Sequence, residues 1–150
     1  LCKDFFIDPY QVYLAKSFGA DAILIILSAI REKTAKEIYD VANRLNITAI
    51  VEVHTNEEAK NALNFKNAIV GINNRNLKTL KTDIATTFNL HKILVNHSGP
   101  LICESGIKTE KEVEEVVRKT KINNFLIGES LLRNLDKNSS LLKKITQISP

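Results

Sequence analysis

The sequence contains few of the residues that build disulfide frameworks and metal centres. It has 150 residues, with two cysteines, Cys2 and Cys103, and three histidines that lack the spacing of metal ligands. Two cysteines cannot form a disulfide framework or a metal cluster. Each lies in an apolar run, where a reduced thiol behaves as a small hydrophobic group. We therefore expect no zinc site and a cytoplasmic location.

Long apolar runs and basic runs are also missing. No stretch approaches the roughly 20 apolar residues that span a bilayer, and no secretory signal pattern is seen. The net charge of +4 and the pI near 9.1 raise the question of a nucleic-acid partner. However, Lys and Arg are dispersed among Asp and Glu, and no basic run has interleaved aromatic residues. We expect neither a nucleic-acid nor a membrane partner.

Short β-rich apolar runs alternate with longer segments that carry apolar residues at helical spacing. Hydrophobic residues make up 44% and charged residues 25%, which is ordinary for a globular protein, and the length suits one domain. The alternation predicts a parallel α/β sheet covered by helices, with strands buried on both faces. The six expected strands are Leu1–Phe5, Ala22–Leu27, Ala49–His54, Ala68–Asn73, Leu101–Glu104 and Asn124–Ile127.

Several helix boundaries are marked in the sequence. Thr34–Leu45 carries apolar residues on one helical face. Thr109–Lys119 does the same and begins with a capping-box pattern. Asp8 and Pro9 predict an N-cap followed by a first helical residue, and Gly19 predicts the end of that helix.

Polar residues interrupt the expected strands mainly at their carboxyl ends. A polar group in a buried strand costs free energy unless it has a partner, so this recurrence at one edge points to a function. Ligands of α/β folds bind at this edge of the sheet. The polar residues are Lys3 and Asp4, Glu52 and His54, Asn73 and Arg75, Glu104 and Ser105, and Gly128, Glu129 and Ser130.

Two glycine turns predict a phosphate site. Ser105-Gly106-Ile107 follows the fifth expected strand, and Gly128-Glu129-Ser130 follows the sixth and precedes a helix. Glycine lets the backbone approach an anion, and free N–H groups at a helix N-terminus favour negative charge. Two such turns on consecutive strands match the phosphate site of TIM barrels, although each glycine alone would be only a turn residue. On length alone an open, flavodoxin-like sheet is favoured, since a complete barrel has about 200 to 250 residues.

Ionisable residues near the strand ends predict acid–base chemistry. In a closed sheet Lys3, Glu52 and Glu104 would converge on one pocket, where a lysine can act as general acid and a carboxylate can accept protons. Taken singly, Lys3 would be a snorkelling lysine and Glu52 a partner in a structural ion pair. His54 is interpreted as a hydrogen-bonded loop residue rather than a catalyst.

Several of these motifs resemble, in order and spacing, those of the indole-3-glycerol phosphate synthase family. The matching segments are Leu1-Cys2-Lys3-Asp4-Phe5, Asp8-Pro9-Tyr10-Gln11, Val51-Glu52-Val53-His54, Gly71-Ile72-Asn73-Asn74-Arg75-Asn76-Leu77, Glu104-Ser105-Gly106-Ile107 and Leu126 to Arg133. The resemblance covers essentially the whole chain. It implies an incomplete (β/α)8 TIM barrel, in which residues 1–150 form a single partial domain with six βα units corresponding to strands 3–8.

The resemblance also implies a reaction. The family closes the pyrrole ring of 1-(o-carboxyphenylamino)-1-deoxyribulose 5-phosphate with loss of carbon dioxide and water, a carbon–carbon lyase step of tryptophan biosynthesis that needs no cofactor or metal. By this resemblance Lys3 is the general acid, Glu52 is a catalytic carboxylate, and Asn73 and Glu104 orient the substrate. The implied substrate- and phosphate-binding residues are Arg75, Ser105, Gly106, Gly128, Glu129 and Ser130. The implied apolar pocket is Leu1, Phe5, Leu24 and Leu77, which are equally compatible with an ordinary core.

The family's N-terminal extension and first two βα units, which carry a Glu-x-Lys motif and a Ser-Pro-Ser turn, have no match in this sequence. We therefore expect a truncated family member that gives little or no turnover alone. Two alternatives stay open. One is another phosphate-binding TIM-barrel enzyme, such as an isomerase. The other is a non-catalytic phosphate-binding fragment that associates with itself or with a complementary fragment through its exposed sheet edges.

Overall fold

A computed structural model of the protein describes residues 1–132 and 139–147. Five parallel strands form one sheet, and neighbours in the sheet are also consecutive in the chain. Parallel neighbours need crossover connections, and helices supply them here. The strands are β1 (Ala22–Ile26), β2 (Thr48–Val53), β3 (Ile69–Asn73), β4 (Leu101–Glu104) and β5 (Asn124–Leu126).

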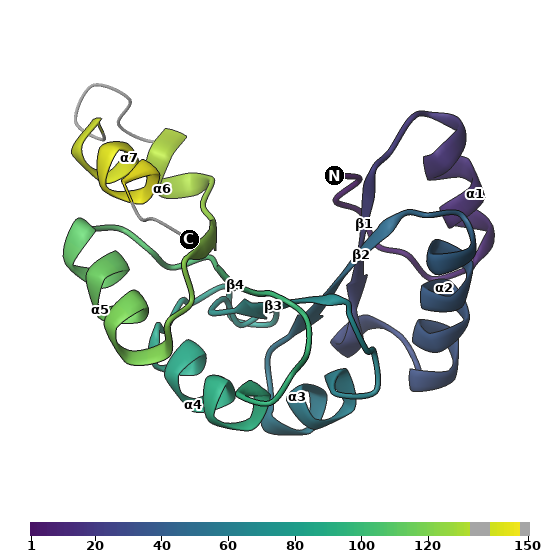
Figure 1. Ribbon diagram of the computed structural model, residues 1–150, viewed down its shortest axis with the longest axis horizontal. Helices are drawn as coiled ribbons and strands as arrows, with labels where there is room; N and C mark the ends of the chain where they lie inside the picture. Colours follow the sequence, from purple (N-terminus) through teal and green to yellow (C-terminus); the bar gives the residue numbers. More distant parts are fainter. Residues whose placement is uncertain (133–138, 148–150) are drawn as a thin grey trace.

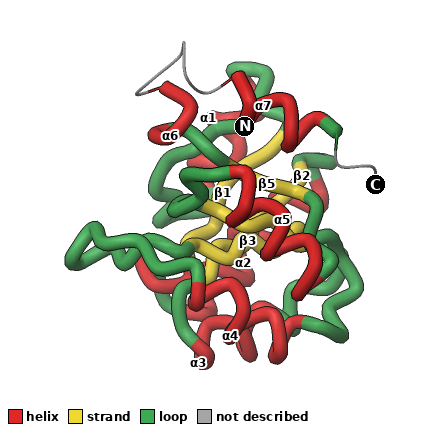
Figure 2. Tube along the Cα trace, turned by 90° about the vertical axis from the view of Figure 1, so that its left-hand side faces the viewer, coloured by secondary structure: helices red, strands yellow, loops and turns green. Residues whose placement is uncertain are grey.

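The sheet curves, and the helices lie along its outer side (Figure 1). In the view turned by 90°, the strands are gathered at the centre with helices around them (Figure 2). This arrangement confirms the α/β class and an incomplete TIM barrel. The helices are α1 (Tyr10–Ser17), α2 (Glu32–Arg44), α3 (Asn56–Ala62), α4 (Ala85–Leu94), α5 (Glu110–Thr120), α6 (Glu129–Leu132) and α7 (Ser139–Thr146), with a short 3-10 helix, η1, at Leu27–Ala29.

The first expected strand differs from the prediction. Instead of a strand over Leu1–Phe5, Cys2 forms a single parallel bridge with Ile23 of β1, held by one hydrogen bond from Cys2 N to Ala22 O at 2.8 Å. Asp4 then bends the chain, because its side chain accepts the N–H of Phe5 at 2.7 Å. The described residues therefore contain five strands, where six were expected, and the backbone of the N-terminal segment pairs with the sheet only through this bridge.

The predicted helices are present, and their ends lie within one or two residues of those expected. The Asp8 carboxylate accepts the N–H of Tyr10 at 2.8 Å, as an N-cap does. Gly19 follows α1 with a φ of +81°, the left-handed conformation that glycine adopts without a Cβ penalty. Thr109 and Glu112 form the full capping box of α5. Among the described residues, no helix combines the length and apolarity that crossing a membrane requires.

The two faces of the sheet carry very different amounts of apolar packing. Side chains alternate between the faces along each strand, so Ile23 and Ile25 pack outward against the helices while Leu24 and Ile26 point inward. The outward residues belong to a large buried core shared with α2, α3, α4 and α5. The inward cluster is small and consists of Leu24, Ile26 and Ile50, with Ile69 and Ile102 partly buried against it. The inner face is where the polar strand ends lie.

Candidate active site

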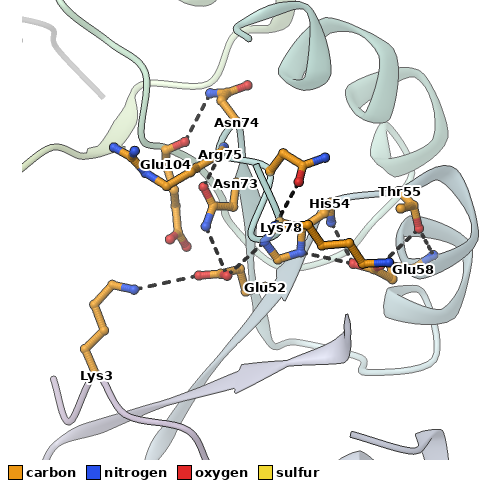
Figure 3. Close-up of polar contacts among 11 residues, drawn as sticks. Lys3, Glu52, His54, Thr55, Glu58, Asn73, Asn74, Arg75, Lys78 and Glu104 are labelled. Carbon is orange, nitrogen blue, oxygen red and sulfur yellow. Dashed lines mark hydrogen bonds and ion pairs between the residues drawn. The ribbon is translucent and has the colours of Figure 1, made fainter. Parts of the chain in front are cut away.

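Three buried polar side chains stand together on the inner face at the carboxyl ends of β2, β3 and β4. Glu52, Asn73 and Glu104 are 1%, 6% and 1% exposed. Asn73 and Glu104 are register partners on β3 and β4, and Glu52 comes from the adjacent strand β2. Figure 3 shows their side chains converging, with Lys3 reaching toward Glu52 from the N-terminal segment. The predicted convergence of Lys3, Glu52 and Glu104 is therefore present, and Asn73 lies among them.

Glu52 is the centre of this cluster. Asn73 Nδ2 donates a hydrogen bond to Glu52 Oε1 at 3.1 Å, and His54 Nε2 lies 3.2 Å from the same oxygen. Lys3 Nζ lies 3.8 Å from Glu52 Oε2. Burial alone would raise the pKa of Glu52, but the contacts with His54 and Asn73 and the charge of Lys3 outweigh it and lower the pKa below its ordinary value. Glu52 is therefore an ionised carboxylate at neutral pH.

His54 links the cluster to the start of α3. Its backbone N–H donates to Glu58 Oε2 at 2.8 Å, and its ring Nδ1 lies 3.2 Å from the same oxygen. Thr55 caps α3 by accepting the N–H of Glu58. Burial opposes protonation of the ring, yet hydrogen bonds to Glu52 and Glu58 prevail and raise the pKa of His54 to about 9. His54 is a hydrogen-bonded cation between two carboxylates, which agrees with its interpretation as a hydrogen-bonded residue.

Glu104 has the opposite electrostatic character. Its Oε1 is buried and has no hydrogen-bond partner among the described residues. Burial and, next, the negative charge of Glu52 raise the pKa of Glu104 to about 8. At neutral pH the site thus contains one ionised carboxylate, Glu52, and one protonated carboxyl group, Glu104. Two neighbouring carboxyl groups with separated pKa values are a common arrangement in acid–base sites.

Asn74 fixes the loops around this cluster. Its Nδ2 donates to the carbonyl oxygens of Glu104 and Ser105, both at 3.1 Å. Its Oδ1 accepts the backbone N–H of Thr87 at 3.0 Å and the hydroxyl of Thr87 at 2.8 Å. The side chain is 2% exposed. One buried amide therefore joins the end of β3, the end of β4 and the start of α4.

A cavity of about 930 Å³ opens beside the cluster. Glu104 lies in its wall, and both predicted glycine turns line it. Ser105 and Gly106 adopt left-handed φ values of +62° and +75°. A Cβ on Gly106 would lie 3.2 Å from the Thr82 side chain, so both backbone and space favour glycine here. The lining residues are Lys3, Arg75, Leu80, Lys81, Thr82, Glu104, Ser105, Gly106, Ile107, Lys108, Leu126, Ile127, Gly128, Glu129 and Ser130.

Arg75 and Glu129 meet across this cavity. Arg75 Nη2 lies 2.5 Å from Glu129 Oε2, which joins the loop after β3 to α6. Ser130 Oγ donates to the carbonyl of Ile107 at 2.5 Å, which ties α6 to the turn after β4. The predicted phosphate-binding residues thus line one cavity, and the carboxylate of Glu129 forms an ion pair with Arg75. Arg133, the last residue of the family-like motif, lies outside the described residues.

The four residues of the predicted apolar pocket do not line this cavity. Leu1, Phe5 and Leu77 are 51%, 59% and 41% exposed. Leu24 is buried in the inner apolar cluster, where Ile26 and Ile50 contact it. In the described part of the chain, only Leu24 of these four is enclosed.

Sequence reasoning did not select Lys81, Thr82 and Lys108, which line the cavity. Thr82 is brought there by an antiparallel bridge to Arg75 that closes the loop after β3. Asn74 was also not predicted to have a role. Its position could have marked it, because Asn74 follows Asn73 at the end of an apolar strand, where a buried amide needs hydrogen-bond partners.

A curved parallel sheet with helices along its outer side places the chain in the TIM-barrel class. Ligands of this class bind at the carboxyl edge of the strands, which is where Lys3, Glu52 and Glu104 lie. Comparison with solved structures agrees on the fold. 3-Keto-L-gulonate-6-phosphate decarboxylase from Vibrio cholerae superposes with a TM-score of 0.69 at 17% identity, over 99% of this chain and 72% of that chain.

The chain belongs to the indole-3-glycerol phosphate synthase family, whose model matches residues 1–144. It is 43% identical over 141 residues to indole-3-glycerol phosphate synthase from Polynucleobacter asymbioticus, covering 94% of this chain and 52% of the relative. It is 46% identical over 132 residues to the tryptophan biosynthesis protein TrpCF from Buchnera aphidicola, covering 88% of this chain and 28% of the relative. The chain thus spans about half the length of the first of these relatives and less of the second.

Proposed function

We propose that this chain carries the greater part of an indole-3-glycerol phosphate synthase site, which closes the indole ring of 1-(o-carboxyphenylamino)-1-deoxyribulose 5-phosphate. The observation that carries the proposal is the cluster of Lys3, Glu52 and Asn73. A half-exposed ammonium stands 3.8 Å from a carboxylate that a buried amide orients, beside a large cavity. Family membership supports the same carbon–carbon lyase reaction.

Lys3 is the general acid of the proposed reaction. Its ammonium group is 50% exposed, so a substrate carbonyl in the cavity can reach it. Ring closure forms a carbon–carbon bond at that carbonyl carbon and places charge on its oxygen, which Lys3 stabilises and protonates. Loss of carbon dioxide from the ring carbon and loss of the resulting hydroxyl as water complete the indole.

Glu52 and Glu104 divide the acid–base work. Glu52 is ionised and accepts a proton during the reaction, whereas Glu104 is protonated and donates a hydrogen bond. Asn73 keeps Glu52 in a fixed orientation through the 3.1 Å hydrogen bond. The cavity wall formed by Ser105 and Gly106 holds the phosphate group at the far end of the substrate, together with Arg75, Gly128, Glu129 and Ser130.

We further propose that the chain alone gives little or no turnover. A TIM barrel has eight strands, whereas the described residues form five. The family's Ser-Pro-Ser phosphate turn is also missing from this sequence. The test is to supply the carboxyphenylamino-deoxyribulose phosphate and follow indole fluorescence, with Lys3→Ala as the control. Turnover near that of a complete synthase would refute the need for further strands. If the parent chain does turn over, an equal rate for Lys3→Ala would refute the role of Lys3.

A second candidate function is association through the N-terminal edge of the sheet. In the described structure the outer edge of β1 has only the Cys2 bridge beside it. Large apolar side chains on the adjoining segment and α1 are exposed: Leu1, Phe5, Ile7, Tyr10, Tyr13, Leu14 and Phe18. An apolar surface of this kind next to an open strand edge favours pairing with a second copy or a complementary fragment.

A further inference from the structure

Gly71 occupies an unusual position for a glycine, in the interior of the central strand β3. It lies opposite Glu52 on β2 and opposite Ile102 on β4. Glycine in a strand interior weakens the strand and needs a local reason. Backbone conformation is not that reason, because the glycines with positive φ are Gly19 and Gly106.

The reason for glycine lies in the space above the strand. A Cβ on Gly71 would lie 1.8 Å from Oε1 of Glu104 and 2.9 Å from its carboxyl carbon. The next atom, Cγ2 of Ile50, would be in ordinary contact at 3.4 Å. The Glu104 carboxyl group therefore fills the volume that any side chain at position 71 would take.

This location decides the surroundings of Glu104. Folded back over β3, its carboxyl group is buried and points toward Glu52, as Figure 3 shows. Glu104 also lines the wall of the cavity, so rotation away from β3 would carry its carboxyl group into open space. The Glu104 side chain can therefore rotate into the cavity without meeting another buried side chain.

We propose that Gly71 is a positioning residue: the absence of its side chain keeps the Glu104 carboxyl group against β3 beside Glu52, and a methyl group there would turn Glu104 into the cavity. The significance for catalysis rests on the proposed function, but the positioning itself does not. Its test therefore uses this chain without substrate, so that failure of the positioning and failure of the proposed synthase activity are distinguishable.

The first measurement is a double-mutant cycle by urea unfolding, with Gly71→Ala, Glu104→Ala and the double variant. We expect Gly71→Ala to lower the unfolding midpoint in the parent protein and to leave it unchanged or raise it when Glu104 is already alanine, because the clashing group is then gone. If Gly71→Ala does not fold but the double variant does, the steric conflict is supported. An equal loss in both backgrounds would overturn the proposal.

The second measurement is one that a purely structural role of Gly71 would not move. The side-chain carboxyl carbon of Glu104 is followed by carbon-13 NMR against pH, with Glu104→Gln used to assign the signal. In the parent the pKa of Glu104 is about 8, and we expect Gly71→Ala to bring it down toward the ordinary 4.5 as the carboxyl group reaches solvent. A pKa that stays near 8 in a folded Gly71→Ala variant would overturn the proposal.

Discussion

Asn74→Ala removes the amide that joins three elements at the rim of the site. The side chain makes four hydrogen bonds to nitrogen and oxygen partners, two to the carbonyls of Glu104 and Ser105 and two from Thr87. Alanine satisfies none of them and leaves the buried N–H of Thr87 without this acceptor. The loops after β3 and β4 and the start of α4 then lose their common support.

The size of the effect follows from these contacts. A net contribution of about 1 kcal/mol for each hydrogen bond gives about 4 kcal/mol for the four. Thr87 can turn its hydroxyl to another acceptor and Ser105 is partly open to water, so about 3 kcal/mol is the expected loss. With a urea dependence of about 2 kcal/mol per molar, the unfolding midpoint falls by about 1.5 M.

The assay is urea unfolding followed by circular dichroism, with Asn64→Ala as the matched control. Asn64 is an exposed asparagine after α3, and its replacement is expected to change the free energy of unfolding by less than about 0.5 kcal/mol. A loss below about 1 kcal/mol for Asn74→Ala, or a loss equal to that of the control, would show that these bonds do not hold the rim together.

Three further results are expected. Folded Glu104 keeps its proton to about pH 8 and His54 to about pH 9, whereas the unfolded groups release theirs near 4.5 and 6.5. Unfolding therefore releases protons, and the urea midpoint should fall as the pH rises from about 4.5 to 9. A midpoint that rises through this range would contradict the raised pKa values of Glu104 and His54. Arg75→Ala breaks a partly exposed ion pair and should lower the free energy of unfolding by less than about 1 kcal/mol. The same substitution should weaken the binding of inorganic phosphate several-fold. Unchanged binding in an NMR titration would exclude Arg75 from the proposed phosphate site. Phe18, which is 83% exposed, should contribute to self-association. Sedimentation should show concentration-dependent oligomers of the parent protein, and Phe18→Asp should reduce them. A monodisperse parent monomer would argue against the outer edge of β1 as an interface.

Much of the fold could be predicted because its signals are local. The apolar runs that became β1, β2 and β3 are almost entirely buried, so their hydrophobicity alone marks them, whereas β4 and β5 are only partly buried. Capping at Thr109 depends on residues three positions apart, and the prediction was confirmed. The segment at Leu1–Phe5 has the same apolar character, but a strand also needs successive backbone partners, and the described structure supplies only one bridge. The residues of a short segment do not show whether a neighbouring strand, distant in the sequence, lies beside it to pair with its backbone.

Part of the candidate site's membership could be predicted from the sequence, but its electrostatics could not. Lys3, Glu52 and Glu104 could be placed together because the carboxyl ends of parallel strands share one edge. The opposite protonation of Glu52 and Glu104 arises because His54, Asn73 and Lys3 contact Glu52, whereas Glu104 is buried beside the negative charge of Glu52, and these side-chain distances cannot be read from the sequence. The exposure of Phe5 likewise depends on what packs over the N-terminal segment, which apolar character alone does not reveal.

The two faces of the sheet are packed unequally, so the residues that stabilise the fold and the polar residues of the candidate site lie on opposite faces. Substitutions on the outer layer, such as those at Ile38 or Val113, act on the large core that sets whether the chain folds. The inner face has few apolar contacts to lose, so its residues near the strand ends can be exchanged while the scaffold persists. Random substitutions in this protein should therefore be accepted far more readily on the concave side than on the convex side.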